Sequence, residues 1–155
     1  MKAEYINPFI TATSEVFRTM LSIDPVRGQL YVKSSEKLPY DISGIIGMAG
    51  EASGFVIISM TETLALRVVE KFIGEKKDKI DEDVMDAVGE ILNMIAGGAK
   101  QVFSRTGIRF KISIPNVVAG KDHVVGKQKN VKCLGMTFKV DDEVFVIEVA
   151  LKEGA

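Results

Sequence analysis

The strongest pattern in the sequence is a long run of apolar residues at helical spacing between residues 81 and 106. At about 100° per residue, these positions fall within about 60° of one direction, the width of a core-facing helix surface. They are Val84, Val88, Ile91, Leu92, Ile95, Ala99 and Val102. The pattern predicts a helix that begins at Asp81 or Asp83 and ends at Ser104 or Thr106, where Gly107 stops it.

The opposite side of this helix carries a polar stripe, formed by Asp86, Glu90, Asn93 and Gly97. An ordinary solvated helix face pairs acidic with basic residues four positions apart, yet residues 81–99 contain no Lys or Arg. Gly89 and Gly97 each cost about 1 kcal/mol relative to Ala in a helix interior. Something other than helix stability therefore explains these residues, and the glycines would let a partner's backbone approach closely.

Weaker patterns predict the other elements. Helical spacing recurs over residues 4–21 and 61–73, with Thr61 or Thr63 as a cap for the second helix and Gly74 as its end. Alternating or continuous apolar runs predict strands at residues 29–33, 41–48, 54–60, 108–114, 131–140 and 144–151. Residues 116–130 are polar and contain glycine, which indicates a long loop or an irregular hairpin. The charged residues 76–79 indicate a solvated linker.

The chain shows a faint internal repeat. When residues 11–20 are laid over 86–95, Glu15 meets Glu90, whereas Thr11 meets Asp86 and Arg18 meets Asn93. Among the strands, Gly47-Met48 corresponds to Gly135-Met136 and Phe55 to Phe145. We therefore expect an α+β fold with two related halves, about residues 1–75 and 80–155, each a helix followed by three strands. The product would be a pseudo-symmetric two-layer α/β sandwich with a mostly antiparallel six-stranded sheet and three helices.

Composition narrows the function classes. A chain of 155 residues is about one domain long, and 20 basic against 21 acidic residues give no reason to expect nucleic acid or an anionic membrane as a partner. The absence of a signal peptide or a long apolar run predicts a cytoplasmic location. One Cys and one His argue against zinc and Ser-His-Asp sites. The acids at residues 81–86 suit the positive end of the helix, and no loop or His completes a metal-ligand set.

The polar stripe suggests a chemistry. Glu90 and Asn93 lie one helical turn apart, so both side chains can enter one cleft of a partner. A carboxylate can pair with a cation there, and an uncharged amide can both donate a hydrogen bond to water and accept one from it. Placing a water in line with phosphorus is most of what phosphoryl hydrolysis requires. From the residues alone, an ordinary surface face remains an alternative.

The motif itself resembles a known family. Asp86-x-x-x-Glu90-x-x-Asn93, followed by Pro115 after 21 intervening residues, is similar to the signature of the CheC, CheX and FliY family of bacterial chemotaxis phosphatases. Chain length, the single motif and the degenerate first helix bring the resemblance nearest to the CheX members. The resemblance implies hydrolysis of the aspartyl phosphate on the response regulator CheY. Asn93 would orient the attacking water, and Glu90 would pair with the regulator's active-site lysine.

The resemblance also implies supporting roles and partners. Asp86 and Pro115 would support the docking surface or the placement of the helix, although Pro115 could equally just end a strand. From their positions on the helical wheel, rather than from the resemblance, Gly89, Met94 and Gly97 would border the docking face. The Mg²⁺ ion would belong to phosphorylated CheY, so this chain would bind no cofactor, and a homodimer would form through sheet strands. Because Thr11 and Arg18 do not match the motif, we expect no second site in the first helix.

Two other function classes stay open at this point. A binding module of the flagellar switch class would share the architecture and tether CheY without hydrolysing its phosphate. A purely structural sandwich would leave the cation-free stripe unexplained.

Overall fold

Two of the described helices begin at a residue whose side chain caps them. The computed structural model describes residues 2–33, 40–121 and 132–154. A short 3-10 turn, η1 (Ala3–Ile6), leads into α1 (Asn7–Leu21), which carries Pro8 in its first turn. The Thr61 hydroxyl accepts a hydrogen bond from the Leu64 N–H at the start of α2 (Glu62–Ile73), and Gly74 ends that helix with φ 73°. Asp81 caps α3 (Glu82–Arg105) by accepting from the Val84 N–H at 3.0 Å.

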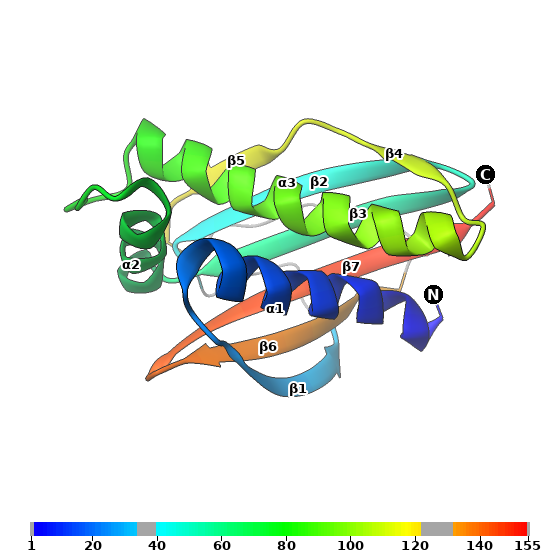
Figure 1. Ribbon diagram of the computed structural model, residues 1–155, viewed down its shortest axis with the longest axis horizontal. Coiled ribbons are helices and arrows are strands. Elements are labelled where there is room, and N and C mark those ends of the chain that lie inside the picture. Colours follow the sequence, from blue (N-terminus) through cyan, green and yellow to red (C-terminus); the bar gives the residue numbers. More distant parts are fainter. Residues whose placement is uncertain (1, 34–39, 122–131, 155) are drawn as a thin grey trace.

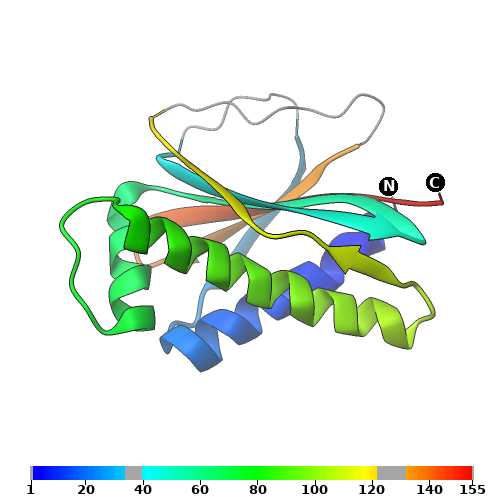
Figure 2. The same cartoon turned by 90° about the horizontal axis from the view of Figure 1, so that it is seen from above.

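The three helices cover one face of a single antiparallel sheet (Figures 1 and 2). Its order is β1-β6-β7-β3-β2-β4, and β5 also pairs with β2. The described strands are β1 (Val26–Val32), β2 (Ile42–Gly50), β3 (Ala52–Met60), β4 (Phe110–Ile112), β5 (Asn116–Ala119), β6 (Leu134–Val140) and β7 (Glu143–Glu153). The predicted α+β sandwich and its three helices are confirmed. In the described part of the chain the sheet has seven strands rather than the predicted six, because residues 116–119 form β5 where a long loop or an irregular hairpin is predicted.

The extra strand arises from a bulge in the chain that runs along one edge of the sheet. β4 and β5 pair with the same strand, β2, but Ser113, Ile114 and Pro115 stand opposite only Ile46 and Gly47. This one-residue excess is a β-bulge, and Pro115, which lacks an N–H, is tolerated there. Ser113 fastens the bulge, since its N–H donates to the Gly47 carbonyl at 2.9 Å and its hydroxyl accepts from the Gly47 N–H at 2.8 Å. The extra residue breaks the alternation of apolar and polar residues, which hides β5 in the sequence.

The two halves of the chain exchange their edge strands. β3 and β7, the last strand of each half, pair at the centre of the sheet. β1 of the first half pairs with β6 of the second, and β4 and β5 of the second half pair with β2 of the first. Gly47 and Gly135 do lie on corresponding strands and on the face away from the helices. The predicted match of Phe55 with Phe145 is wrong, because Phe55 lies on the outer face near Ile57 and Phe145 is in the core.

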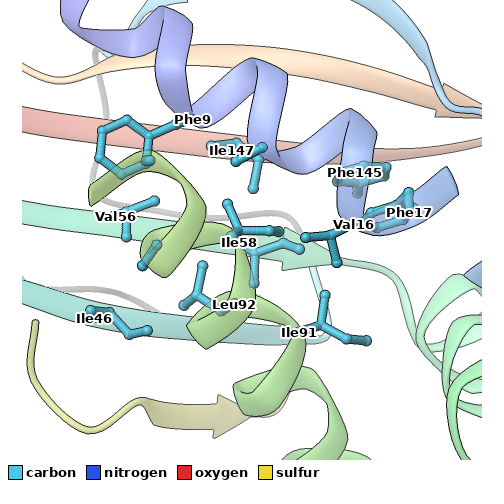
Figure 3. Close-up of a cluster of buried hydrophobic side chains, with 14 of the residues drawn as sticks. Phe9, Val16, Phe17, Ile46, Val56, Ile58, Ile91, Leu92, Phe145 and Ile147 are labelled. Atoms are coloured by element: carbon cyan, nitrogen blue, oxygen red, sulfur yellow. The ribbon is translucent and has the colours of Figure 1, made fainter. Parts of the chain in front are cut away.

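The core lies between the helices and the sheet. Phe17 and Phe138 stack on Phe145 at centroid distances of 4.6 and 5.0 Å, and Figure 3 shows Phe17 and Phe145 beside aliphatic side chains from both layers. The predicted apolar side of α3 is buried except for Val102, which lines a surface depression near Tyr5. The predicted helix face is therefore correct over all but its last turn.

A buried charge pair lies on the outer face of the sheet. Glu148 is 2% exposed, accepts a hydrogen bond from the Tyr31 hydroxyl at 2.7 Å, and pairs with the Lys33 ammonium at 3.0 Å. Tyr31 reaches Glu148 by passing over Gly135, where an added Cβ would stand 2.2 Å from the tyrosine ring. Because Gly135 has no side chain, Tyr31 can reach the buried Glu148 carboxylate, which then has both Tyr31 and Lys33 as partners.

We expect Gly135→Ala to lower the free energy of unfolding by about 2–3 kcal/mol, because a displaced Tyr31 leaves a buried carboxylate short of a donor. Urea denaturation measures this change. Gly97→Ala is the matched control, since its methyl would meet nothing within 4 Å and should stabilise α3 by about 0.5–1 kcal/mol. Equal stability of the two variants would contradict the role given to Gly135.

Candidate functional site

The rotation of α3 about its own axis is fixed by close contacts with the sheet and with α1. On the sheet side, Leu92 packs over Gly44 of β2, where an added Cβ would lie 3.3 Å from the leucine side chain. On the α1 side, Gly98 faces Ala12, and an added Cβ would lie 3.2 Å from the alanine methyl. Both distances leave little room for a larger side chain, so α3 sits close against its neighbours.

A third contact involves the edge bulge. Gly89 is buried, and an added Cβ there would lie 3.5 Å from the Pro115 ring and 3.4 Å from the Val117 side chain. The sequence predicts that Gly89 leaves room for a partner's backbone, but the chain's own β4–β5 segment occupies that position. Pro115 and Gly89 are thus brought together, and Pro115 lies where it can hold α3 in place.

The polar stripe faces away from the core. Asp86 and Glu90 are exposed, Asn93 is half-buried, and Gly97 has open space where a Cβ would stand. Met94 is half-buried at the rim and packs against the core. In Figure 1 this side of α3 lies between β5 on one side and α1 and α2 on the other. The structure therefore places the predicted site residues on one surface, except Gly89, which lies beneath Pro115.

The stripe carries negative charge that no other described residue neutralises. Within the described residues, the side chains of Asp86, Glu90 and Asn93 make no hydrogen bond or ion pair. Asp86 and Glu90 are like charges four residues apart, which costs helix stability about 0.2–0.5 kcal/mol. Both lie beyond the first turn, where the helix dipole no longer offsets this cost. A partner that supplies a cation would remove it.

The acids at the start of α3 are, by contrast, paired with Lys77. The Lys77 ammonium lies 2.8 Å from Asp83, 3.2 Å from Asp81 and 3.6 Å from Glu75, and its side chain is only 12% exposed. Hydrogen bonds to Asp83 and Asp81 raise the pKa of Lys77. The pKa of Asp81 is lowered, mainly by the hydrogen bond from the Val84 N–H and to a smaller extent by Lys77. The prediction that residues 76–79 form a solvated linker is therefore wrong for Lys77. This lysine joins the turn before α3 to the first turn of α3. A charge run in a sequence carries no sign of such a clamp.

A groove lies between the end of α2 and the polar stripe. Phe72 and Ile73 line it from α2, and Asp83, Asp86 and Glu90 line it from α3. Across the described parts of the chain, no three His, Cys, Asp or Glu side chains gather closely enough to hold a metal ion. His123 lies outside the described residues. None of the described helices combines the length and apolar character needed to cross a membrane.

The arrangement can therefore bind a cation at Glu90 and hold a water at Asn93. A half-buried amide on a rigid helix has few orientations, which suits the positioning of a nucleophile. An exposed, unpaired carboxylate one turn away suits recognition of a basic side chain. Both functions need a partner that brings the reacting group to α3.

Comparison with known proteins shows which family this sequence and fold match. The family model described as chemotaxis phosphatase CheX matches residues 42–139. The chain is 29% identical to the CheY-P phosphatase CheX of Thermotoga maritima, with 99% of each chain covered. A crystal structure of a CheC-like superfamily protein from Shewanella sp. PV-4 has a TM-score of 0.91 at 35% identity and covers 98% of this chain and 99% of that one.

A second similar structure is a CheX–CheY–BeF₃–Mg²⁺ complex from Borrelia burgdorferi. It has a TM-score of 0.84 at 28% identity, and the match covers 98% of this chain and 100% of that one. The family model spans more than half of the chain, and the similar structures share the chain's arrangement of helices and strands. This chain belongs to the CheX family of chemotaxis phosphatases.

Proposed function

We propose that this protein hydrolyses the aspartyl phosphate of a CheY-type response regulator. The observation that carries the proposal is the outward pair of a half-buried Asn93 and an unpaired Glu90 on a rigid α3, in a chain of the CheX family. A full-length relative is named a CheY-P phosphatase, and a similar protein has been crystallised with CheY. The cytoplasm, where such regulators act, is the proposed location.

In the proposed reaction Asn93 positions the nucleophile. Its side-chain carbonyl accepts a hydrogen bond from a water and aligns the water oxygen with phosphorus, opposite the aspartate oxygen. The new bond joins the water oxygen to phosphorus, the bond from phosphorus to the aspartate oxygen breaks, and the water protons leave with inorganic phosphate. Positioning and electrostatics dominate such transfers, so an amide that cannot ionise is sufficient.

The regulator supplies the rest of the chemistry in this proposal. Its own Mg²⁺ ion neutralises the phosphoryl oxygens, so no metal ligand is required from this chain. Glu90 pairs with the regulator's active-site lysine and thereby sets the direction from which Asn93 approaches. Asp86, Met94 and Gly97 border the contact, and Pro115 and Gly89 act from beneath by holding α3.

We also propose that the protein forms a homodimer through sheet strands. β1 lies at an edge of the sheet and pairs only with β6 in the described part of the chain. Val26, Leu30 and Val32 on this strand are exposed. An edge with unpaired backbone groups and apolar side chains is a template for pairing with another strand, and a second β1 would complete it symmetrically.

Asn93→Ala should leave the regulator's affinity unchanged and reduce the acceleration of dephosphorylation by about 10²-fold or more, because the water loses its positioning group. The decay of the phosphorylated regulator, followed over time, measures this loss. Asn116→Ala on β5 is the control for removal of an exposed amide. Undiminished acceleration by the Asn93 variant would show that this residue does not position the water, and binding without any acceleration by the unaltered protein would favour a binding module.

Glu90→Gln should raise the free energy of unfolding by about 0.2–0.5 kcal/mol, because it removes the like-charge contact with Asp86. The same variant should raise the regulator concentration needed for half-maximal rate by about tenfold, since the lysine loses its partner. Denaturant titration and the decay assay together measure the two effects. Glu15→Gln, at the corresponding position of α1, should change neither the rate nor the affinity, and a matching effect there would refute the role of Glu90.

The double variant Leu30→Lys, Val32→Lys should be monomeric, because it places like charges on both copies of the paired edge. Light scattering after size exclusion measures the mass of the variant and of the unaltered protein. A monomeric unaltered protein, or a variant that still dimerises, would exclude a dimer through β1.

A further inference from the structure

We propose that the phosphorylated regulator docks against two apolar side chains that flank the polar stripe, Ile114 in the edge bulge and Ile73 at the end of α2. The inference rests on the proposed function and names the surface through which the substrate is recognised. Neither isoleucine belongs to the motif on α3.

Ile114 is held on a rigid backbone although its side chain is 84% exposed. The residue before it, Ser113, is fastened to Gly47 by two hydrogen bonds, and the residue after it, Pro115, packs on Gly89 of α3. Bulges of this kind re-aim side chains beside functional sites. An apolar side chain fixed in this way loses little further freedom on binding, which favours affinity.

Ile73 is held on the other side of the stripe. It is the last residue of α2, it is 41% exposed, and it shares the groove with Glu90 and Asp86. Gly74 ends the helix directly after it, and the Lys77 clamp joins the following turn to the start of α3. Its position relative to the stripe is therefore also fixed.

The two isoleucines flank the same part of α3. Pro115, next to Ile114, contacts Gly89, while Ile73 lines the groove with Glu90, the next residue of the helix. Gly89 and Glu90 point to different sides of α3, since successive residues differ by about 100°. Asp86 and Glu90 therefore form an acidic centre, with Ile114 on one flank and Ile73 on the other.

Charge decides which partner fits this surface. A symmetric contact between two copies would bring each acidic centre against its own kind, because a two-fold interface joins the same patch of both chains. Like charges facing each other across an interface are unfavourable. A regulator that presents the lysine proposed as the partner of Glu90 is complementary in charge, and a similar protein has been crystallised with CheY, so we commit to the regulator as the occupant.

Binding of the regulator activated with beryllofluoride and Mg²⁺, measured by titration calorimetry, tests the inference without catalysis. Ile73→Asp and Ile114→Asp should each raise Kd about tenfold or more, and the alanine variants about fivefold, because buried apolar anchors dominate binding energy. The control is Val144→Asp, whose side chain is 36% exposed on β7, on the outer face of the sheet. Thermal unfolding of each variant verifies that it folds.

An unchanged Kd for both isoleucine variants, an equal rise for Val144→Asp, or no binding by the unaltered protein would overturn the inference. Retained binding by Asn93→Ala together with weakened binding by the isoleucine variants would support it. The proposed function fails in a different way, namely if the unaltered protein binds the regulator and leaves the lifetime of its phosphate unchanged.

Discussion

The site depends on the fixed rotation of α3, which is held by close contacts on three sides. Leu92 over Gly44 meets the sheet, Gly98 meets α1, and Gly89 meets the proline of the bulge. Each contact uses a glycine, on one partner or the other, to bring backbones close together. What remains of the helix surface is a narrow arc, and the acids and the amide lie on that arc. Changes at buried positions far from the motif should therefore turn the amide away from its water.

Stability and function oppose each other on this arc. Two unpaired carboxylates and an open glycine at position 97 all weaken the helix in isolation. The stacked phenylalanines of the core and the long central pairing of β3 with β7 stabilise the fold and offset this loss of helix stability. Lys77 lowers the cost at the start of the helix, because its ammonium pairs with Asp81 and Asp83. Among the described residues, Asp86 and Glu90 in the middle of the helix have no such cation.

Local sequence patterns were sufficient for the helix faces and caps, and long-range pairing was not. The periodicity of α3, its start at Asp81 or Asp83 and the stop of α2 at Gly74 depend on neighbours a few residues away. These predictions are confirmed, with Asp81 as the cap of α3. The packing of Pro115 on Gly89 and the pairing of β5 with β2 depend on a bulge that erases the strand pattern. Lys77 is a similar case, because the sequence does not show which lysine of residues 76–79 lies among three carboxylates. The roles of Asn93 and Glu90 came from the motif and remain to be tested.

The exchange of edge strands affects how the chain can fold while it is being synthesised on the ribosome. When the first half has emerged, β1 has no strand to pair with, because its only described neighbour, β6, is encoded more than a hundred residues later. β2 can already pair with β3, but its other edge waits for the segment that follows α3. Domains fold as units during synthesis, and here the unit is nearly the whole chain. A product truncated before β6 would therefore leave β1 unpaired, and a nascent chain would expose this strand until β6 has been synthesised.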